Sequence, residues 1–515
     1  MHIVLINPPF HAVTSRTGEQ IPFGLLAIGG PLRDAGHDVT LIDAEVQYLS
    51  LAQTAQKVLA CAPDLIMTGH AGSTPAHPLI TQMAQTLKLA LPDVPIVYGG
   101  VFPTYHGQDI LQHEAAFDVI VRGEGERTAV LLAQAYAQRQ ALSEVPGIVY
   151  RVGDRVLATG DAEMILQLDD CRVGWELIDN WDLYQCWGAG RAAIIQLSRG
   201  CPHPCTYCGQ RGFWSRWRYR TPEQVAEEIA WLYHEHGVTF IDLADENPTS
   251  VPRIWQRFLE AMIEQNVPVK LFATLRAADV VRDKDILTLY KQAGFECILM
   301  GIETTDEKTM ALIRKGSTLS KDYQAIQLLR EHRILSMVGY IVGFEEERWS
   351  DYWHSIKQML WYDPDLLNAM YVTPHRWTPF YAESGHRQVV LEDRSKWDYR
   401  HQVLATKYMQ PWQVFLAVKT MEVFVHLRPR ALMRLLAYPD GEIRKGLRWC
   451  IRHAAGAWWD EIMDFMRTRY RRNGQSLFAF WGSPLASVEK ALKKPEVSVT
   501  VKFTANRLRQ RGNSQ

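Results

Sequence analysis

Short apolar runs separated by helix-length segments recur in two parts of this chain. In the first part, residues 1–135, there are five such runs, each bounded by Gly, Pro or Asp: 3–6, 39–42, 65–67, 96–98 and 119–121. Continuous apolar strands separated by helices are typical of a buried parallel sheet covered on both faces. The pattern predicts the α/β class, with an N-terminal doubly wound, Rossmann-like domain.

A second series of six runs lies within residues 191–385. The runs are 194–198, 240–243, 270–273, 297–300, 338–342 and 367–372. Six strands that alternate with helices predict a partial (β/α)6 barrel, with its site at the carboxyl ends of the strands. Between the two parts, residues 136–190 read as a connector with a short hairpin. Residues 386–515 read as a basic helical C-terminal region.

The size and composition of the chain agree with several globular domains. At 515 residues and 59.0 kDa it is too long for one core. Its N-terminus, MHIVLINPP, has neither a basic segment nor a cleavage site, and no run approaches the length of a transmembrane helix. We therefore expect a cytoplasmic protein with reduced cysteines.

Charge is unevenly distributed along the chain. Residues 401–515 contain 20 Lys and Arg against 8 Asp and Glu, a net charge of +12, so the net charge of −1 leaves −13 for the first 400 residues. A basic region of this kind has three interpretations: nucleic-acid binding, docking to an anionic membrane surface, or a solvated helical face. No nucleic-acid recognition motif accompanies the charge, so we expect no nucleic-acid partner.

Three of the eight cysteines fall within eight positions, as Cys201, Cys205 and Cys208 in CPHPCTYC. Structural zinc needs four ligands, and no fourth lies at the usual spacing. A redox pair would use Cys205 and Cys208 and leave Cys201 without a role. A [4Fe–4S] cluster held by three thiolates keeps one iron open to a substrate or cofactor.

The spacing C-x3-C-x2-C, with the aromatic Tyr207 before the last cysteine and an apolar run just upstream, resembles the radical S-adenosylmethionine (SAM) enzymes. In that family the open iron binds SAM, and reductive cleavage of SAM yields the 5′-deoxyadenosyl radical. The resemblance makes Cys201, Cys205 and Cys208 the cluster ligands and catalytic residues, and Tyr207 a cofactor contact.

Three later segments of the second part extend this resemblance. The second strand ends in ADENPT, where relatives bind the SAM amino group, and the fourth ends in GIET, where they meet its ribose or carboxylate. The fifth, GYIVGFEE, fits the family's G-x-I-x-G-x-x-E adenine motif. The SAM contacts that the resemblance implies are Asp245, Glu246, Glu303, Gly339, Ile341, Gly343 and Glu346.

The loops that follow the N-terminal strands resemble the cobalamin-binding domain that precedes many radical SAM enzymes. The GGVFPT loop at 99–104 and the RGEGE segment at 122–126 are the most specific parts. The implied cobalamin contacts are Ser73, Thr74, Gly99, Gly100, Gly123 and Glu124. The Asp-x-His-x-x-Gly motif is absent, so we expect no histidine from that motif below cobalt.

Segments near 213–220, 231–238, 243–249 and 363–380 are most similar to the anaerobic magnesium-protoporphyrin IX monomethyl ester oxidative cyclases. That family closes the isocyclic ring of (bacterio)chlorophyll with oxygen from water. The resemblance implies a tetrapyrrole substrate and a reductant such as flavodoxin or ferredoxin. The loop at 8–13 departs from that family, and two alternatives stay open: a cobalamin-dependent radical SAM C-methyltransferase, or a non-enzymatic corrinoid and Fe–S sensor.

Aromatic residues and arginines alternate in the segment after the cysteines. Flat apolar surfaces and bidentate cations together suit a porphyrin that carries a propionate. The alternative is a packed aromatic segment with exposed arginines. The residues concerned are Trp214, Arg216, Trp217, Arg218, Tyr219 and Arg220.

Overall fold

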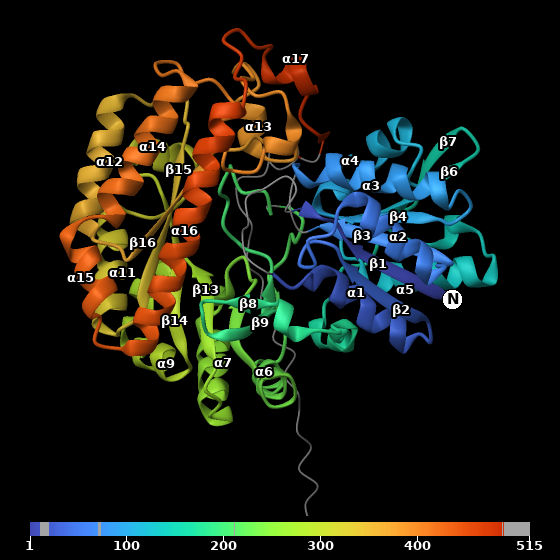
Figure 1. Ribbon diagram of the computed structural model, residues 1–515, viewed down its shortest axis with the longest axis horizontal. Coiled ribbons are helices and arrows are strands. Elements are labelled where there is room, and N and C mark those ends of the chain that lie inside the picture. Colours follow the sequence, from blue (N-terminus) through green and yellow to red (C-terminus); the bar gives the residue numbers. More distant parts are fainter. Residues whose placement is uncertain (11–19, 71–73, 211, 487, 489–515) are drawn as a thin grey trace, which may run out of the picture.

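The computed structural model contains two α/β bodies in contact, with a helical C-terminal region packed on the second (Figure 1). It describes residues 1–10, 20–70, 74–210, 212–486 and 488. Of the predicted site residues, Ser73 lies outside the described residues.

The first body is a seven-stranded sheet in the order β2-β1-β3-β4-β5-β6-β7. Its first five strands are parallel: β1 (His2–Asn7), β2 (Asp38–Asp43), β3 (Leu65–His70), β4 (Ile96–Gly100) and β5 (Val119–Val121). The helices are α1 (Phe23–Asp34), α2 (Leu51–Cys61), α3 (Ala76–Ala90), α4 (Val101–His113) and α5 (Glu126–Gln138).

Side chains of β1 alternate between two hydrophobic cores. Ile3 and Leu5 pack with residues of α1 and α5, whereas Val4 and Ile6 pack with residues of α2, α3 and α4. Because successive strand residues point to opposite faces, both faces of the sheet are covered. The predicted doubly wound domain is confirmed. Its strand order reverses between β1 and β3, where ligands of such sheets bind.

The hairpin predicted in the connector belongs to this first sheet. β6 (Ile148–Val152) pairs antiparallel with β5, and β7 (Arg155–Ala158) pairs antiparallel with β6. Local pattern predicted the hairpin but not its partner, because strand pairing is set by packing across the domain. Short 3-10 turns then lead to β8 (Gln185–Cys186).

The second body is a curled sheet in the order β16-β15-β14-β13-β12-β9-β8. All six predicted strands are present and parallel: β9 (Gly190–Ile195), β12 (Val238–Leu243), β13 (Lys270–Leu275), β14 (Phe295–Glu303), β15 (Leu335–Val342) and β16 (Leu366–Tyr371). The outer helices are α6 (Pro222–His236), α7 (Pro252–Gln265), α8 (Ala277–Arg282), α9 (Leu287–Gln292), α10 (Glu307–Leu312), α11 (Leu319–Glu331) and α12 (Trp349–Tyr362). The predicted partial barrel is confirmed.

One strand differs from the expectation. The apolar run 194–198 was predicted to continue straight into the cysteine loop, but β9 ends at Ile195. The chain then forms β10 (Ser198–Arg199), which pairs antiparallel with β11 (Arg218–Tyr219). This small ladder closes the base of the cysteine loop.

The helices that follow β16 cover the open side, the base and the carboxyl end of the barrel. They are α13 (Pro379–Glu383), α14 (Pro411–His426), α15 (Pro429–Ala437), α16 (Gly441–Arg467) and α17 (Leu477–Trp481). At the base, Phe240, Cys297 and Leu335 of the strands form one core with Ile443 and Leu447 of α16. Higher up, α16 packs on α14, where the rings of Phe415 and Phe465 lie 4.0 Å apart (Figure 1). No helix of the described residues is long and apolar enough to cross a membrane.

Candidate active site

The cysteine loop is held by its backbone. Gly200 has φ +95°, and a Cβ there would lie 2.6 Å from the carbonyl oxygen of Arg216, so only glycine fits. In the middle of the loop, the Thr206 amide donates to the carbonyl of Ile313 at 3.0 Å, and its carbonyl accepts from the Phe380 amide at 3.0 Å. The loop is therefore fixed between the segments that follow α10 and begin α13.

The three thiols of this loop differ in exposure. Cys205 is buried, Cys208 is partly buried, and Cys201 is an exposed residue. Shielding of the sulfur atoms from water, with a smaller contribution from the neighbouring thiols, raises the pKa of Cys201 to about 11 and that of Cys208 to about 12. Metal binding replaces these protons, and three thiolates from one loop are the donor set of a [4Fe–4S] cluster with one open iron. The residues present fit that cluster.

Glu303 lies beside this loop at the end of β14. Its φ is +69°, and a register shift between β14 and β15 falls at the same place, so the strand bulges there. Its Oε1 accepts hydrogen bonds from the Tyr207 hydroxyl and from Lys315 Nζ, each at 2.8 Å. Burial disfavours the charge on Lys315, but Glu303 and Cys205 together outweigh that effect and raise the pKa of Lys315. The sequence interpretation missed Lys315, because no spacing rule links it to a strand end.

Asp245 and Glu246, which follow β12, hold the backbone that enters the cysteine loop. Asp245 accepts from the amides of Leu197 and Ser198 and from the Ser198 hydroxyl. Glu246 Oε2 accepts from the Gly200 amide at 3.0 Å. Burial raises the pKa of Asp245 to about 7 and that of Glu246 to about 8. Both carboxylates thus order the loop, and their contact with SAM stays a prediction.

The GYIVGFEE segment places its motif residues at the end of β15. Gly339 and Ile341 lie on the strand, and Ile341 packs in a core that Tyr207 borders. Glu346 is exposed and pairs with Lys407 at 3.2 Å.

The more enclosed acid of that turn is the next residue, Glu347, which is partly buried. Its Oε2 accepts from the Gly343 amide at 2.8 Å and from the Tyr352 hydroxyl at 2.7 Å. Burial raises the pKa of Glu347 to about 7. The motif pointed to Glu346 and missed Glu347, whose role depends on Tyr352 of the next helix.

Three loops of the N-terminal domain are tied together at its carboxyl edge. The Thr104 hydroxyl donates to the Gly100 carbonyl at 2.7 Å and accepts from the Gly123 amide at 2.9 Å. Gly100 has φ +113°, and a Cβ there would lie 2.9 Å from the carbonyl oxygen of His70. A Cβ on Gly99 would meet only Val121, at 3.7 Å. Close backbone packing at Gly100, with no clash for a Cβ at Gly99, fits the approach of a cobalamin.

Glu124, a predicted cobalamin contact, forms ion pairs with the barrel. Its carboxylate accepts from Arg218 Nη1 at 2.8 and 2.9 Å and from Arg199 Nη1 at 3.1 Å. Arg218 is buried, and Arg220 pairs with Glu228 at 2.6 Å. These two arginines, considered above for substrate binding, have partners within the protein and are not the exposed arginines of the packed-segment alternative.

A second contact between the two bodies is centred on His375, which follows β16. Its Nδ1 lies 3.1 Å from the hydroxyl of Thr74, a predicted cobalamin contact, and its Nε2 lies 2.6 Å from the Tyr399 hydroxyl. Burial lowers the pKa of His375 to about 3, so the ring is neutral at physiological pH. The ring also stacks on Trp377, whose indole NH donates to the Gly209 carbonyl at 2.7 Å. The carboxyl edges of the two sheets therefore face each other, with the cysteine loop and the glycine loops between them.

Comparison with known proteins finds a separate family match for each of the two bodies. Residues 11–133 match the B12 binding domain, and residues 195–359 match the radical SAM superfamily. The chain is 49% identical to the anaerobic magnesium-protoporphyrin IX monomethyl ester cyclase of Synechocystis sp., over 94% of this chain and 97% of that protein. The chain belongs to this cyclase family. The cyclase of Cereibacter sphaeroides is 31% identical over 96% of the chain and 84% of its own length.

More distant similarities agree with the fold. TsrM from Kitasatospora setae, a radical SAM methyltransferase, has a TM-score of 0.65 at 15% identity, covering 83% of this chain and 90% of its own. The cobalamin-dependent radical SAM enzyme OxsB has a TM-score of 0.64 at 16% identity, covering 96% of this chain and 79% of its own.

This member of the cyclase family is a radical SAM enzyme of the oxidative cyclase type. Its cofactors are a [4Fe–4S] cluster, SAM and cobalamin. The predicted family and cofactors are confirmed. Membership of the cyclase family supports an enzyme rather than the non-enzymatic corrinoid and Fe–S sensor. The contacts of individual residues with these cofactors stay predictions.

Proposed function

We propose that this chain acts on magnesium-protoporphyrin IX monomethyl ester and closes its isocyclic ring, with the new oxygen taken from water. The identity of 49% with a cyclase of that name, over 94% of the chain, carries this proposal. Ring closure with oxygen from water oxidises the porphyrin, and SAM is the oxidant, since it is consumed to methionine and 5′-deoxyadenosine. A reductant such as flavodoxin or ferredoxin supplies the electron that the cluster needs to cleave SAM.

We assign Cys201, Cys205 and Cys208 to the cluster. With SAM and cobalamin bound, these cofactors supply radical chemistry at an unactivated carbon. The protein positions them: Glu246 holds Gly200 at the start of the cysteine loop, and Lys315 and Tyr207 hold Glu303 beside it. We assign Glu303 to SAM, because its second oxygen, Oε2, is not used by either of these two contacts.

The contacts between the two bodies limit the access of water to the region between the sheets. His375 is buried and uncharged, and the rings of Trp377 and Tyr105 are parallel, with centroids 5.1 Å apart. An apolar wall of this kind protects a radical from quenching by solvent. A flat tetrapyrrole also suits such aromatic surfaces.

A C-methyltransferase is the second candidate. Hopanoid C-3 methylase of Methylococcus capsulatus is 27% identical over 82% of the chain and 81% of its own length. That identity is well below the 49% with the cyclase of Synechocystis sp., which also covers more of both chains, so the cyclase reaction is preferred.

The test is anaerobic incubation with SAM, a reductant, cobalamin and the magnesium porphyrin ester, followed by mass spectrometry. Ring closure adds one oxygen and removes four hydrogens, so the product gains about 12 mass units. When the water is labelled with a heavy oxygen isotope, the product carries that label. A gain of about 14 units would report methylation instead. Cys205→Ala is the control and should lose both the cluster and SAM cleavage. Steady cleavage of SAM with an unchanged porphyrin would refute this substrate.

A further inference from the structure

Helix α14 is apolar on two opposite sides. Val414, Met421 and Val425 are buried against the barrel. Trp412 and Leu416, one helical turn apart, are 56% and 49% exposed on the other side, and Leu427 further along the same side is 60% exposed. A helix that is apolar all round normally lies inside a protein or against a membrane. The outer side of α14 therefore exposes large apolar side chains where a helix in water usually carries polar ones.

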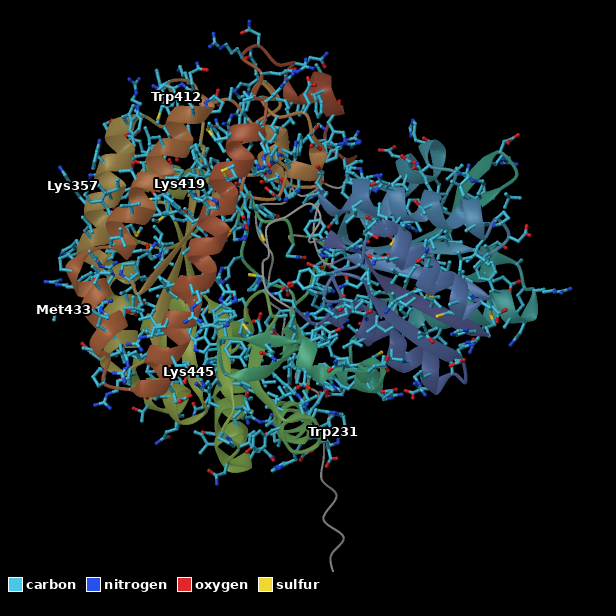
Figure 2. The ribbon with its side chains drawn as sticks, viewed as in Figure 1. Trp231, Lys357, Trp412, Lys419, Met433 and Lys445 are labelled. Carbon is cyan, nitrogen blue, oxygen red and sulfur yellow. The ribbon has the colours of Figure 1, made fainter. Side chains whose placement is uncertain are left out.

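Neighbouring helices extend this outer side. Trp353 of α12 is exposed, and its ring meets that of Phe424 of α14 edge-on at 5.8 Å. Met433 of α15, which packs beside α14, is 67% exposed. We call Trp353, Trp412, Leu416, Phe424, Leu427 and Met433 the apolar helical surface. Figure 2 shows Trp412 and Met433 on the side of the molecule away from the N-terminal domain.

Basic side chains surround the apolar helical surface. Lys357 is exposed one turn after Trp353 on α12, Arg430 is exposed on α15, and Lys445 and Arg452 are exposed on α16. Figure 2 shows Lys357 and Lys445 on this side of the molecule. The acid of α14, Glu422, is partly buried and pairs with Lys419 at 2.9 Å, so it does not offset the outer positive charge.

We infer that the apolar helical surface docks this enzyme onto a membrane that contains anionic lipids. Tryptophan prefers the boundary between hydrocarbon and water, and exposed Lys and Arg beside it attract anionic head groups. A second copy of the chain is a poorer occupant, because two such surfaces would bring the exposed lysines and arginines of both copies together. The contact is peripheral, since none of the described helices spans a bilayer. The inference does not depend on the proposed substrate.

Co-sedimentation of the full-length protein with vesicles tests this inference. One set of vesicles is phosphatidylcholine alone, and the other also contains phosphatidylglycerol. We expect binding to the anionic vesicles that weakens with salt. Trp412→Ser with Leu416→Ser should weaken it at least tenfold, and Lys357→Glu with Arg430→Glu should do the same, since each basic residue near an anionic surface contributes roughly fivefold to affinity.

Matched control variants show whether a loss of vesicle binding is specific to the apolar helical surface. Trp231→Ser on α6 and Arg253→Glu on α7 change exposed residues outside the apolar helical surface, and they should bind as the unchanged protein does. Every variant keeps the basic residues after 488, so their contribution is common to all. Unchanged SAM cleavage shows that each variant is folded.

Three results would overturn the inference. They are the absence of binding to anionic vesicles, equal loss of binding in the control variants, and a dimer in solution that Trp412→Ser with Leu416→Ser dissociates. The last result would assign the surface to a second copy. None of these readouts requires turnover of the porphyrin, so failure of the proposed function would be seen separately.

Discussion

Lys315 Nζ lies 2.8 Å from Oε1 of Glu303, and both side chains are buried at the carboxyl end of β14. The Tyr207 hydroxyl donates to the same oxygen. This contact connects the cysteine loop to a strand end and fixes the direction of the carboxylate.

We expect Lys315→Met to lower the free energy of unfolding by about 3 kcal/mol, because it leaves a buried carboxylate without its cation. SAM affinity, measured by calorimetry, should fall as Glu303 loses its orientation. Lys308→Met, at an exposed position of α10, is the control. If Glu303→Gln combined with Lys315→Met is no more stable than Lys315→Met alone, the ion pair is not the cause.

Glu124→Gln should loosen the contact between the two bodies. Arg218 is buried, and burial lowers its pKa, so loss of the Glu124 charge leaves it poorly compensated. We expect a loss of about 3 kcal/mol in chemical unfolding and faster proteolysis between the domains. Glu144→Gln, an exposed change in the same domain, should have no effect. Unchanged proteolysis in Glu124→Gln would mean that other contacts hold the bodies together.

Two adjacent glycines should respond differently to added bulk. Gly99→Leu should prevent cobalamin binding in a folded protein, because a Cβ at Gly99 meets only Val121 at an ordinary distance. Gly100→Leu should destabilise the domain itself, because its side chain would collide with the His70 carbonyl. Absorbance of bound cobalamin and circular dichroism separate the two effects. Full cobalamin binding by a folded Gly99→Leu variant would remove this loop from the cobalamin site.

His401 should make stability depend on pH. Burial opposes its protonation, but hydrogen bonds with Asp398 at 2.9 Å and Asp464 at 2.6 Å outweigh burial and raise its pKa to about 9. A pKa raised on folding stabilises the folded state fully below the unfolded pKa near 6.5, and the contribution is lost as pH rises through about 9.

His401→Gln should therefore cost about 2 kcal/mol near pH 6, an amount reduced because Asp464 is partly exposed, and much less near pH 10. Chemical unfolding at the two pH values measures the difference. His453→Gln, at an exposed position of α16, should lack this dependence. An equal cost at both pH values would assign the effect of His401 to packing.

The apolar runs predicted every parallel strand, because strands buried on both faces carry their signal locally. The ends of those strands then pointed to Glu303 and to the cysteine loop. Lys315, Glu347 and His375 were not predicted, since each acquires its partner through packing between elements. Glu124 was predicted from its motif, but its pairing with Arg218 depends on how the two bodies meet.

The basic character of residues 401–515 was visible in the sequence, but its arrangement was not. Charge counts do not show which side of a helix faces water. The exposed side of α14 became visible only when the packing of Val414 and Met421 against the barrel was known.

The closure of the barrel base by Ile443 and Leu447 sets an order of events during synthesis on the ribosome. The cysteines are made early, but the helix that seals the barrel beneath them is made near the end. Proteins fold in units as they emerge, so the nascent barrel stays open at its base while several hundred residues are already outside the ribosome. A ribosome that stalls before α16 therefore leaves an unsealed barrel for chaperones and proteases.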